Sequence, residues 1–416
     1  MRILLWHGYL LGGATGSNVY TRALAHAWSR AGHDVVVFCQ EPQPERFDLA
    51  GAEVVRPELP GGLLPVFVLD RYEGLEARLL TDFTHEERER YVAANAASVS
   101  ARLPADLVFA NHVLMGGPVA AATGALYGVK AHGSELEYAM RGNRELSEWG
   151  KEALTGARAV FVGSAHIRSV LEEVVGHVDR VDEVPPGVDV DEFAPQGREE
   201  ALAALLEECR DDLPNPGNEN ERLPDEGNAE RLAAWFQSDE PTVLYFGKLL
   251  YNKGIHLLFE ALREVGARAI VVGFGDYRGD LEPDAPRGTL FTGPLEHRHL
   301  VHLIPLCEVT VVPSIFPEAF GMVAAEAAAG GSLPLVARHS GLAAVAEGLE
   351  HEYPPELRAL ASFETGNAQA LAHRLSALLA LPPDERQALR KAARQAAVAN
   401  WSWPRIAQRL LAPFTE

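Results

Sequence analysis

The sequence has few cysteines and no long apolar run. Its three cysteines, Cys39, Cys209 and Cys307, show no C-x-x-C spacing and cannot all pair. This excludes a disulfide framework, gives no indication of a zinc site and favours a reducing compartment. No stretch reaches the roughly 18 consecutive apolar residues of a membrane-spanning helix, and the first eight residues resemble a strand more than a secretory leader. The sequence therefore predicts a soluble, cytoplasmic protein.

Positive charge is also scarce. Lys and Arg total 37 against 58 Asp and Glu, so the formal net charge is −21. A field of that sign repels nucleic acids and anionic lipid surfaces, which excludes both as expected partners, although a local pocket can still hold a small anion. The 47% of hydrophobic residues in a chain of 416 is typical of a globular protein of two or three domains.

Short, continuous apolar runs alternate with helical patterns in both halves of the chain. Such runs are typical of parallel strands covered by helices on both faces, and they predict two doubly wound α/β domains. The expected join is Val184–Val188, which contains two prolines and a glycine, and residues 211–230 are expected to form a surface insertion. The predicted strands are Arg2–Trp6, Asp34–Phe38, Asp106–Ala110, Gly128–Ala131, Arg158–Val162, Thr242–Gly247, Arg268–Gly273, Gly288–Gly293, Glu308–Pro313 and Leu333–Arg338.

Ligands of such folds bind beyond the carboxyl ends of the strands, so the loops after strands are the candidate sites. The first loop contains Gly13 and Gly16 and precedes a helix, which suits close approach of a phosphate to backbone amides. The alternative is a plain glycine turn with Ser17 as a helix cap. The second loop starts at Gly247 and carries Lys248 and Lys253, two cations that can neutralise a diphosphate unless both are simply solvated.

The third loop carries a pair of carboxylates. Glu318 follows a strand directly, and Glu326 lies among alanines on the next helix, where a buried carboxylate needs hydroxyl partners. The amides of Phe320, Gly321 and Met322 at the start of that helix are free donors. Sugar and ribose hydroxyl groups fit both carboxylates. In the alternative interpretation, Glu318 assists the helix cap and Glu326 is an exposed helix position.

Together, Glu318-x7-Glu326, the Gly-Lys-x4-Lys-Gly loop, the early Gly-Gly loop and Pro186-Gly187-Val188-Asp189 resemble a retaining GT-B glycosyltransferase of family 4. The resemblance implies two Rossmann-like domains facing a central cleft: residues 1–185 for the acceptor, 186–400 for the donor, and 401–416 as a helix crossing back to the first domain. It implies metal-independent, retaining transfer of a hexosyl group from a nucleotide sugar, by default a UDP-sugar, to a soluble small-molecule or saccharide acceptor. No further cofactor is implied.

The resemblance also assigns roles to residues. Glu318 would bind hydroxyl groups of the donor sugar with the amides of Phe320, Gly321 and Met322, and Glu326 would hold the ribose. Lys248 and Lys253 would neutralise the diphosphate, approached by Gly13 and Gly16, and His132 would contact the sugar near the reacting carbon. The alternative for His132 is a strand-end histidine satisfied by backbone groups. The sequence departs from the family pattern at Lys248, where arginine is usual, and at Ser340-Gly341, where a Gly-Gly pair is common.

Other readings are weaker. Asp189-Val190-Asp191 imitates a metal-binding D-x-D but suits a helix-start cap, and the turn at Gly273–Gly279 imitates a dinucleotide fingerprint with its last glycine one residue late. A non-catalytic nucleotide-sugar or glycan-binding protein stays as the main alternative, with an NAD-dependent dehydrogenase behind it. The acceptor, the base and the oligomeric state are not predicted. The basic residues that an anionic acceptor would need are expected to be solvated: Arg71, Lys130, Arg141 and Arg144.

Overall fold

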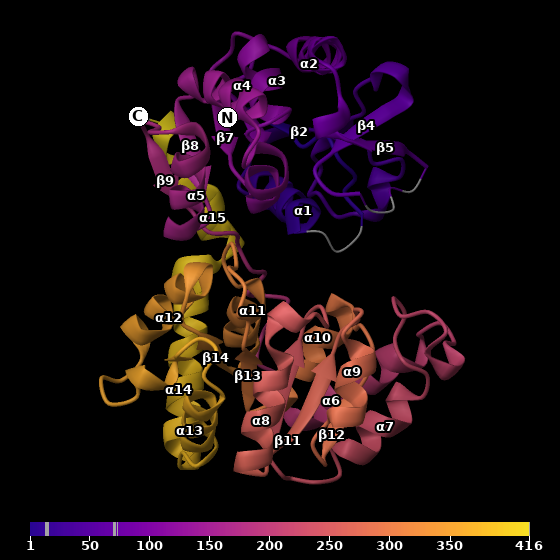
Figure 1. Cartoon of the computed structure of the whole chain (residues 1–416), viewed down its shortest axis with the longest axis vertical. Helices are drawn as coiled ribbons and strands as arrows, with labels where there is room; N and C mark the ends of the chain where they lie inside the picture. Colours follow the sequence, from indigo (N-terminus) through magenta and orange to yellow (C-terminus); the bar gives the residue numbers. More distant parts are fainter. Residues whose placement is uncertain (13–15, 70–71, 73, 416) are drawn as a thin grey trace. The chain divides into compact units, whose positions relative to one another are not determined.

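The structure is a computed structural model that describes residues 1–12, 16–69, 72 and 74–415. Its internal contacts divide the chain into two compact units (Figure 1). Unit 1 comprises Met1–Gly187 together with Trp403–Glu416, and unit 2 comprises Val188–Ser402. The chain therefore leaves unit 1, forms all of unit 2, and returns to unit 1 for its last helix.

Within the described residues, unit 1 is built on a seven-stranded parallel sheet of order β3-β2-β1-β6-β7-β8-β9, with a separate parallel pair β4-β5. Parallel neighbours require crossover connections, and helices supply most of them. The strands are β1 Arg2–Trp6, β2 Asp34–Phe38, β3 Glu53–Val55, β4 Leu63–Val66, β5 Glu76–Leu79, β6 Leu107–Asn111, β7 Tyr127–Lys130, β8 Ala159–Val162 and β9 Val181–Glu183. The α-helices are α1 Gly16–Arg30, α2 His85–Ser100, α3 Gly116–Ala122, α4 Arg144–Thr155, α5 Ala165–Val175 and α15 Trp403–Leu411.

The central strands of the unit 1 sheet, β1, β6, β7 and β8, are buried on both faces. Along β1, Ile3 and Leu5 belong to one apolar cluster and Leu4 and Trp6 to another, because successive side chains point to opposite sides of a sheet. The first cluster also contains Trp28 of α1 and the buried face of α15. This two-sided burial explains why the strands read as continuous apolar runs rather than as alternating ones.

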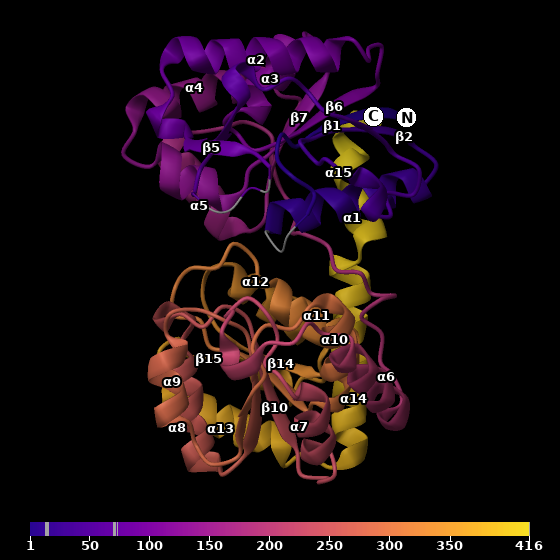
Figure 2. The same cartoon turned by 90° about the vertical axis from the view of Figure 1, so that its right-hand side faces the viewer.

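Unit 2 repeats the plan with a six-stranded parallel sheet of order β12-β11-β10-β13-β14-β15 among the residues described. Helices lie on both faces of this sheet (Figures 1 and 2), with α8 against α13 and α11 against α14. The strands are β10 Thr242–Phe246, β11 Arg268–Val272, β12 Thr289–Phe291, β13 Val309–Val312, β14 Leu333–Ala337 and β15 Ser362–Phe363. The α-helices are α6 Arg198–Arg210, α7 Asn228–Trp235, α8 Ile255–Val265, α9 Arg278–Asp284, α10 His297–Leu303, α11 Met322–Gly330, α12 Ser340–Glu352, α13 Ala368–Leu379 and α14 Pro383–Ala396.

The predicted fold class, two doubly wound α/β sheets, is confirmed, and each of the ten predicted strands is found with ends that differ by at most two residues. Residues 211–230 are mostly exposed, as expected of a surface insertion, but the segment is held by buried polar side chains. Asn215 and Asp225 are buried: the Asn215 amide donates to the carbonyls of Asn220, Leu223 and Pro224, and Asp225 pairs with Arg278. The segment also contains the first turn of α7. Polar side chains, rather than apolar periodicity, attach this segment to unit 2.

The helical run near the carboxyl terminus is interrupted before its last helix. A π-helical turn, Ala397–Trp401, ends the helical run that α14 begins, and α15 starts at Trp403. Helix α15 packs beside α1 (Figure 2), and the Trp28 indole donates to the Ala407 carbonyl at 3.0 Å. None of the helices in the described ranges combines the length and apolar character that a membrane span needs.

Candidate active site

The strand order of unit 2 reverses between β10 and β13, which is the point where ligands bind in doubly wound sheets. The loops after these two strands meet there. Gly254 has a φ of +71°, and a Cβ atom at this position would lie 2.0 Å from the Pro313 carbonyl oxygen. The amides of Ile315 and Phe316 donate to the Asn252 carbonyl at 3.0 and 3.2 Å. Glycine thus permits a close approach of the lysine loop to the glutamate loop.

This approach brings two of the predicted residues together. The Lys253 ammonium lies 2.5 Å from Glu318 Oε1, with both side chains about three-quarters buried. Lys248 is exposed, and in the part of the chain that the structure describes its side chain has no charged or hydrogen-bonded partner. The two predicted cations therefore differ: one is held by a carboxylate and the other is open to solvent.

The main chain at Glu318 is fixed by the start of α12. Its amide donates to the Ser340 hydroxyl at 2.8 Å, that hydroxyl lies 3.0 Å from His339 Nδ1, and His339 Nε2 lies 2.7 Å from the Ser314 carbonyl. Because a carbonyl can only accept, His339 Nε2 carries the proton and Ser340 donates to Nδ1. Ser340 has a φ of +45°, a conformation that favours glycine. Serine at this family glycine position keeps the turn and adds a hydrogen bond to the Glu318 loop.

Helix α11 begins beside this loop. Gly321 is its N-cap with a φ of +124°, and the amides of Phe320, Gly321 and Met322 have no hydrogen-bond acceptor among the described residues. These donors lie two to four residues after Glu318. An N-terminal turn with open amides favours an anion or an oxygen acceptor nearby.

Glu326 is buried, with 6% of its surface exposed, on a helix whose neighbouring alanines are also buried. Burial raises the pKa of its carboxyl group, the nearby His297 partly opposes this, and Glu192 adds to it. His297 Nε2 lies 3.7 Å away, which is an ion-pair distance rather than a hydrogen bond. The interpretation of Glu326 as an exposed helix position is wrong. A buried carboxylate with so little compensation favours hydroxyl groups as hydrogen-bond donors.

The glycine turn after β11 is built for packing. A Cβ atom at Gly273 would lie 1.8 Å from the Gly247 carbonyl oxygen, and one at Gly275 would lie 2.4 Å from the Leu249 carbonyl oxygen. The Leu249 amide donates to the Phe274 carbonyl at 2.7 Å. These glycines therefore support the lysine loop, which accounts for the imitation of a dinucleotide fingerprint. Gly247 itself has a φ of +151°.

In unit 1 the order reverses between β1 and β6. Of the two glycines predicted in the first loop, Gly13 lies outside the described residues, and Gly16 is the exposed first residue of α1, with nothing within 4 Å of an added Cβ. The amides of Leu11 and Gly12 both donate to Glu41 Oε2 at 3.0 Å. The sequence analysis did not find Glu41, because no local pattern links it to a loop 29 residues earlier.

His132 follows β7 and lies in a cluster of imidazole rings. Its ring centroid is 4.6 Å from that of His112, its amide donates to Glu135 Oε1 at 2.6 Å, and Nε2 lies 3.1 Å from Asn111 Oδ1. Burial lowers the pKa of His132 well below its usual value, and His112, Lys130 and His7 lower it further. The prediction singled out His132 but missed His7 and His112, which the strand order brings beside it.

His7 and His112 are similarly fixed. His112 Nδ1 lies 3.2 Å from Glu135 Oε2, and His7 Nε2 lies 3.0 Å from Asn18 Oδ1. Burial, followed by His112, lowers the pKa of His7 to about 3. Within the described ranges, His7 Nδ1 and His112 Nε2 are buried without a partner. The cluster therefore consists of rings that each have one nitrogen engaged and one bare.

The basic residues proposed for an anionic acceptor are mostly engaged, and Arg71 lies outside the described residues. The expectation that Lys130 is solvated is wrong: it is buried, its ammonium lies 2.5 Å from the Val184 carbonyl, and burial, with Arg409, lowers its pKa to about 7. Arg141 pairs with Glu137 and Glu173, and Arg144 pairs with Glu148. Lys130 is the last residue of β7, whose side chains are all buried, and it lies inside the predicted strand Gly128–Ala131.

The Asp189-Val190-Asp191 triplet forms a capped turn. Asp189 Oδ1 accepts from the amides of Asp191 and Glu192 at 3.1 and 2.9 Å. The expectation of a helix at this point is wrong, because the next helix, α6, starts at Arg198. Asp189 is thereby engaged with its own main chain.

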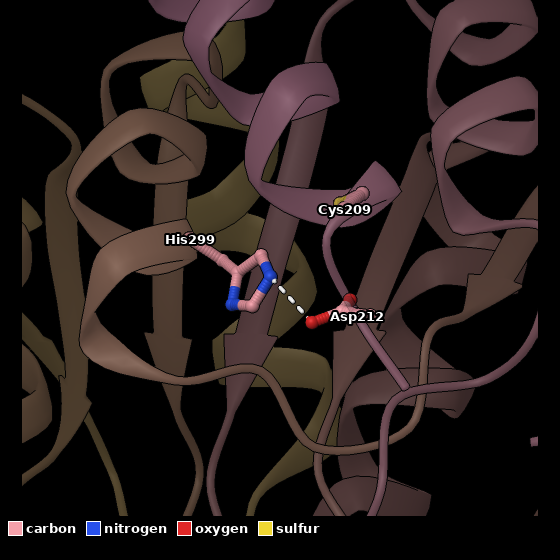
Figure 3. Close-up of side chains that lie close together, drawn as sticks. All are labelled: Cys209, Asp212 and His299. Carbon is pink, nitrogen blue, oxygen red and sulfur yellow. Dashed lines mark ion pairs between the residues drawn. The ribbon is translucent and has the colours of Figure 1, made fainter. Parts of the chain in front are cut away.

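Cys209, Asp212 and His299 form a cluster that the sequence did not indicate (Figure 3), with ligand atoms within 4.8 Å of one another. His299 Nε2 lies 3.1 Å from Asp212 Oδ1, which Arg298 also contacts at 2.5 Å. His299 Nδ1 accepts from the Glu296 amide at 3.2 Å, so the neutral ring carries its proton on Nε2. Burial lowers the pKa of His299 and raises that of Cys209 to about 12. A metal ion would have to displace a guanidinium and two protons, so we assign the cluster to packing between α6 and α10.

Comparisons with known proteins agree with this architecture. Residues 15–187 match the family model for a glycosyl transferase 4-like domain, and residues 230–396 match that for glycosyl transferases group 1. A D-inositol 3-phosphate glycosyltransferase of Xylanimonas cellulosilytica is 29% identical over 213 residues, covering 47% of this chain and 44% of that protein. An uncharacterised glycosyltransferase of Methanocaldococcus jannaschii is 33% identical over 131 residues, covering 29% of this chain and 33% of that protein.

Solved structures show the same fold. Sucrose-phosphate synthase from Thermosynechococcus elongatus has a TM-score of 0.67 and 21% identity, covering 98% of this chain and 97% of that one. The Anabaena protein HepE in complex with UDP and glucose has a TM-score of 0.67 and 16% identity, with all of both chains covered. The chain belongs to the GT-B glycosyltransferases of the family 4 type. Its matched segments span less than half the length of these two curated relatives.

Proposed function

We propose that the protein is a metal-independent, retaining glycosyltransferase that moves a hexosyl group from a nucleotide sugar, preferably a UDP-sugar, to a soluble small-molecule or saccharide acceptor. The observation that carries this proposal is the Lys253–Glu318 pair at the strand reversal of unit 2, beside the open amides of α11. Three kinds of group that a sugar diphosphate needs lie together here. The cation suits the charged phosphate oxygens, the carboxylate suits the sugar hydroxyls, and the amide donors suit neutral oxygen acceptors.

The diphosphate is assigned to Lys253 and Lys248. An ammonium group has three N–H donors, so Lys253 can contact a phosphate oxygen and keep its bond to Glu318. Lys248 is exposed and supplies a second charge, in the manner of a point charge rather than the bidentate arginine usual in the family. These preorganised donors stabilise the negative charge that develops on the leaving nucleoside diphosphate.

The ribose is assigned to Glu326. The transferred sugar is assigned to Glu318, to the amides of Phe320, Gly321 and Met322, and to His132. Burial removes water from the Glu326 carboxylate and raises its pKa. Two ribose hydroxyls that donate to this carboxylate would replace the lost water and favour the charged form. Glu318 has its amide held by Ser340, so its carboxylate is positioned before substrate arrives. The neutral His132 ring offers a hydrogen-bond acceptor to a sugar hydroxyl.

The configuration at the anomeric carbon is retained if the acceptor hydroxyl attacks from the same face of the sugar that the phosphate leaves. The bond from the anomeric carbon to the phosphate oxygen breaks as the bond to the acceptor oxygen forms, and the leaving phosphate oxygen takes the acceptor proton. This step needs no covalent sugar–enzyme intermediate. The relatives support a sugar-nucleotide donor, since HepE is bound to UDP and glucose. Their names imply different acceptors, among them D-inositol 3-phosphate, so the acceptor identity is not carried over.

The test is release of nucleoside diphosphate from a panel of UDP-, GDP- and ADP-sugars, with and without EDTA. Replacing Lys248 or Lys253 with Ala is expected to lower the rate by about 10²–10³, as for loss of one preorganised donor. Lys248→Arg should retain most of the rate and Lys248→Gln should not, because only arginine keeps the charge. Transfer that is abolished by EDTA but unaffected by the lysine substitutions would contradict metal independence.

The two glutamates are separated by binding measurements. Glu326→Ala is expected to weaken binding of the free nucleoside diphosphate by about 1–3 kcal/mol, because the ribose hydroxyls lose their acceptor. Glu318→Gln should leave that affinity nearly unchanged and lower turnover. Isothermal titration with UDP measures both. Equal losses of UDP affinity would refute the division of roles, and binding without any turnover across the panel would favour a non-catalytic nucleotide-sugar-binding protein.

A further inference from the structure

A chain of hydrogen bonds in unit 1 ends at His132. The Thr21 hydroxyl donates to the Ser17 carbonyl at 2.7 Å, the Asn111 amide nitrogen donates to Thr21 Oγ1 at 2.9 Å, and Asn111 Oδ1 lies 3.1 Å from His132 Nε2. The residues come from α1, from the end of β6 and from the loop after β7. Strand order, not sequence proximity, assembles them.

The first hydrogen bond of this series, from Thr21 to Ser17, fixes the donor and the acceptor in each of the others. A backbone carbonyl can only accept, so the single hydroxyl proton of Thr21 points at Ser17. Thr21 Oγ1 must then accept, and of the two ends of the Asn111 amide only the NH₂ group can donate to it. The Asn111 oxygen is left facing His132, which must carry its proton on Nε2.

Burial makes this assignment rigid. Thr21 and Asn111 are fully buried, which leaves no room for water to serve as a substitute partner. Burial also lowers the pKa of His132 well below its usual value, so the ring is neutral around pH 7 and has one proton to place. With that proton on Nε2, Nδ1 is a bare lone pair, and it has no hydrogen-bond partner among the described residues.

We propose that Asn111 is a positioning residue that holds His132 as the neutral Nε2–H tautomer, so that Nδ1 accepts a hydrogen bond from a hydroxyl group of the substrate. This inference rests on the proposed function for the identity of the substrate, but not for the tautomer. It assigns a specificity: His132 binds a hydroxyl donor and rejects an unprotonated phosphate or carboxylate oxygen, whose lone pair would oppose that of Nδ1. It also excludes His132 as a proton donor in the reaction.

The tautomer can be measured without any activity. In protein labelled with ¹⁵N-histidine, the long-range proton–nitrogen correlation pattern distinguishes Nε2–H from Nδ1–H rings, and His132→Gln identifies the signal. We expect the Nε2–H pattern for His132 from pH 6 to pH 8. A proton on Nδ1, or a charged ring in this range, would overturn the proposal whether or not the protein transfers sugars.

Substitutions of Thr21 test the anchor. Thr21→Val removes the acceptor for the Asn111 NH₂ group, so the amide can turn and present NH₂ to His132, which moves the proton to Nδ1. We expect the Nδ1–H pattern and a loss of about tenfold in kcat/KM, the scale of one hydrogen bond. Thr21→Ser keeps the hydroxyl and should restore both the pattern and the rate. If Thr21→Val and Thr21→Ser give the same tautomer of His132, the Thr21 hydroxyl does not orient the Asn111 amide and the proposal is refuted.

Asn111→Asp provides a test with a pH signature. Aspartate still accepts from Nε2 but favours the protonated ring, so the pKa of His132 rises towards its ordinary value of about 6.5. The titratable groups facing the ring are His112, Lys130, His7, Glu135 and Tyr20, and none of these is altered. Activity of this variant should fall below about pH 7 and recover above it, since protonation removes the Nδ1 lone pair. A pH profile identical in shape to that of the natural protein would contradict the role.

If no nucleotide sugar is consumed by the natural protein, the proposed function fails while the tautomer result stands. If the protein is active but His132 carries its proton on Nδ1, the tautomer proposal fails while the proposed function stands. The two ideas are therefore separable by the pair of measurements.

Discussion

At the scale of single residues, Ser340 shows how a side chain can replace a glycine and gain a function. Its φ of +45° is costly for residues other than glycine, yet its hydroxyl accepts from the Glu318 amide and donates to His339. Gly341 next to it must lack a side chain, because a Cβ there would lie 2.5 Å from the Phe320 nitrogen. One position of the family Gly-Gly pair is therefore a steric requirement, and the other is not.

We predict that Ser340→Ala destabilises the protein more than Ser340→Gly. Both substitutions remove the hydrogen bonds, at about 1–2 kcal/mol, but glycine also relieves the positive φ, which is worth up to about 1 kcal/mol. Urea unfolding of the two variants measures the difference. Turnover should fall in both, because the Glu318 loop loses its anchor. Equal stability of the two variants would show that the backbone at Ser340 is not strained.

Sequence reasoning found the residues that local pattern marks and missed those that topology recruits. Glu318 and the lysine loop stand directly after apolar strands, so the rule for doubly wound sheets was enough to select them. Glu326 was selected because it is a carboxylate among alanines on the helix that follows. Asn111 and His112 stand directly after the predicted strand Asp106–Ala110, so the same rule could have selected them. Thr21 lies inside α1 and carries no such mark, since its partner lies on another element. Lys130 lies inside the predicted strand Gly128–Ala131, so its burial agrees with a strand covered on both faces and contradicts only the expectation of a solvated charge.

At the scale of elements, Gly254 joins two loops and begins a helix. It is the N-cap of α8, and its missing side chain leaves space for the Pro313 carbonyl at the end of β13. Gly266, at the other end of α8, has the same φ of +71° but nothing within 4 Å of an added Cβ. Substitution of Gly266 therefore measures the stability cost of a side chain at this φ alone. Substitution of Gly254 adds the cost of a steric clash.

We expect Gly266→Ala to cost about 1 kcal/mol, as is typical of alanine at a positive φ. Gly254→Ala should cost clearly more and should also weaken binding of nucleoside diphosphate, because β13 and Glu318 are pushed away from Lys253. Chemical unfolding and isothermal titration with UDP give the two readouts. Equal effects of the two substitutions on both would mean that the loops are not held by this close approach.

Element prediction succeeded where apolar runs were long and failed where they were short or polar. The unpredicted strands are β3, β4, β5, β9 and β15, of two to four residues each, and several include charged residues such as Glu53, Arg78 and Asp182. Edge strands and the separate β4-β5 pair need less apolar surface, so their sequence signal is weak. The turn at Asp189 was read as a helix start because capped turns and helix N-termini share the same side-chain bonds.

At the scale of the whole molecule, the last helix of the chain completes the first unit. Trp403, Ile406 and Leu410 of α15 are buried in the cluster that contains Ile3, Leu5 and Trp28. Phe414 lies against Gly128 of β7, where a Cβ would be 2.6 Å from its ring. One apolar core therefore depends on residues about 400 positions apart, and unit 1 reaches its full stability after unit 2 has been synthesised.

This arrangement predicts that substitutions in α15 destabilise unit 1 rather than unit 2. Leu410→Ala leaves a cavity in the unit 1 core and should cost about 2–5 kcal/mol. Hydrogen exchange is expected to accelerate in β1 and β6 while β10 and β13 keep their protection. The matched control is Leu375→Ala in α13, an equally buried leucine of the unit 2 cluster, which should have the reverse effect. If Leu410→Ala accelerated exchange in both sheets to the same extent, the two units would unfold as one, and α15 would be a structural member of the whole chain rather than of unit 1.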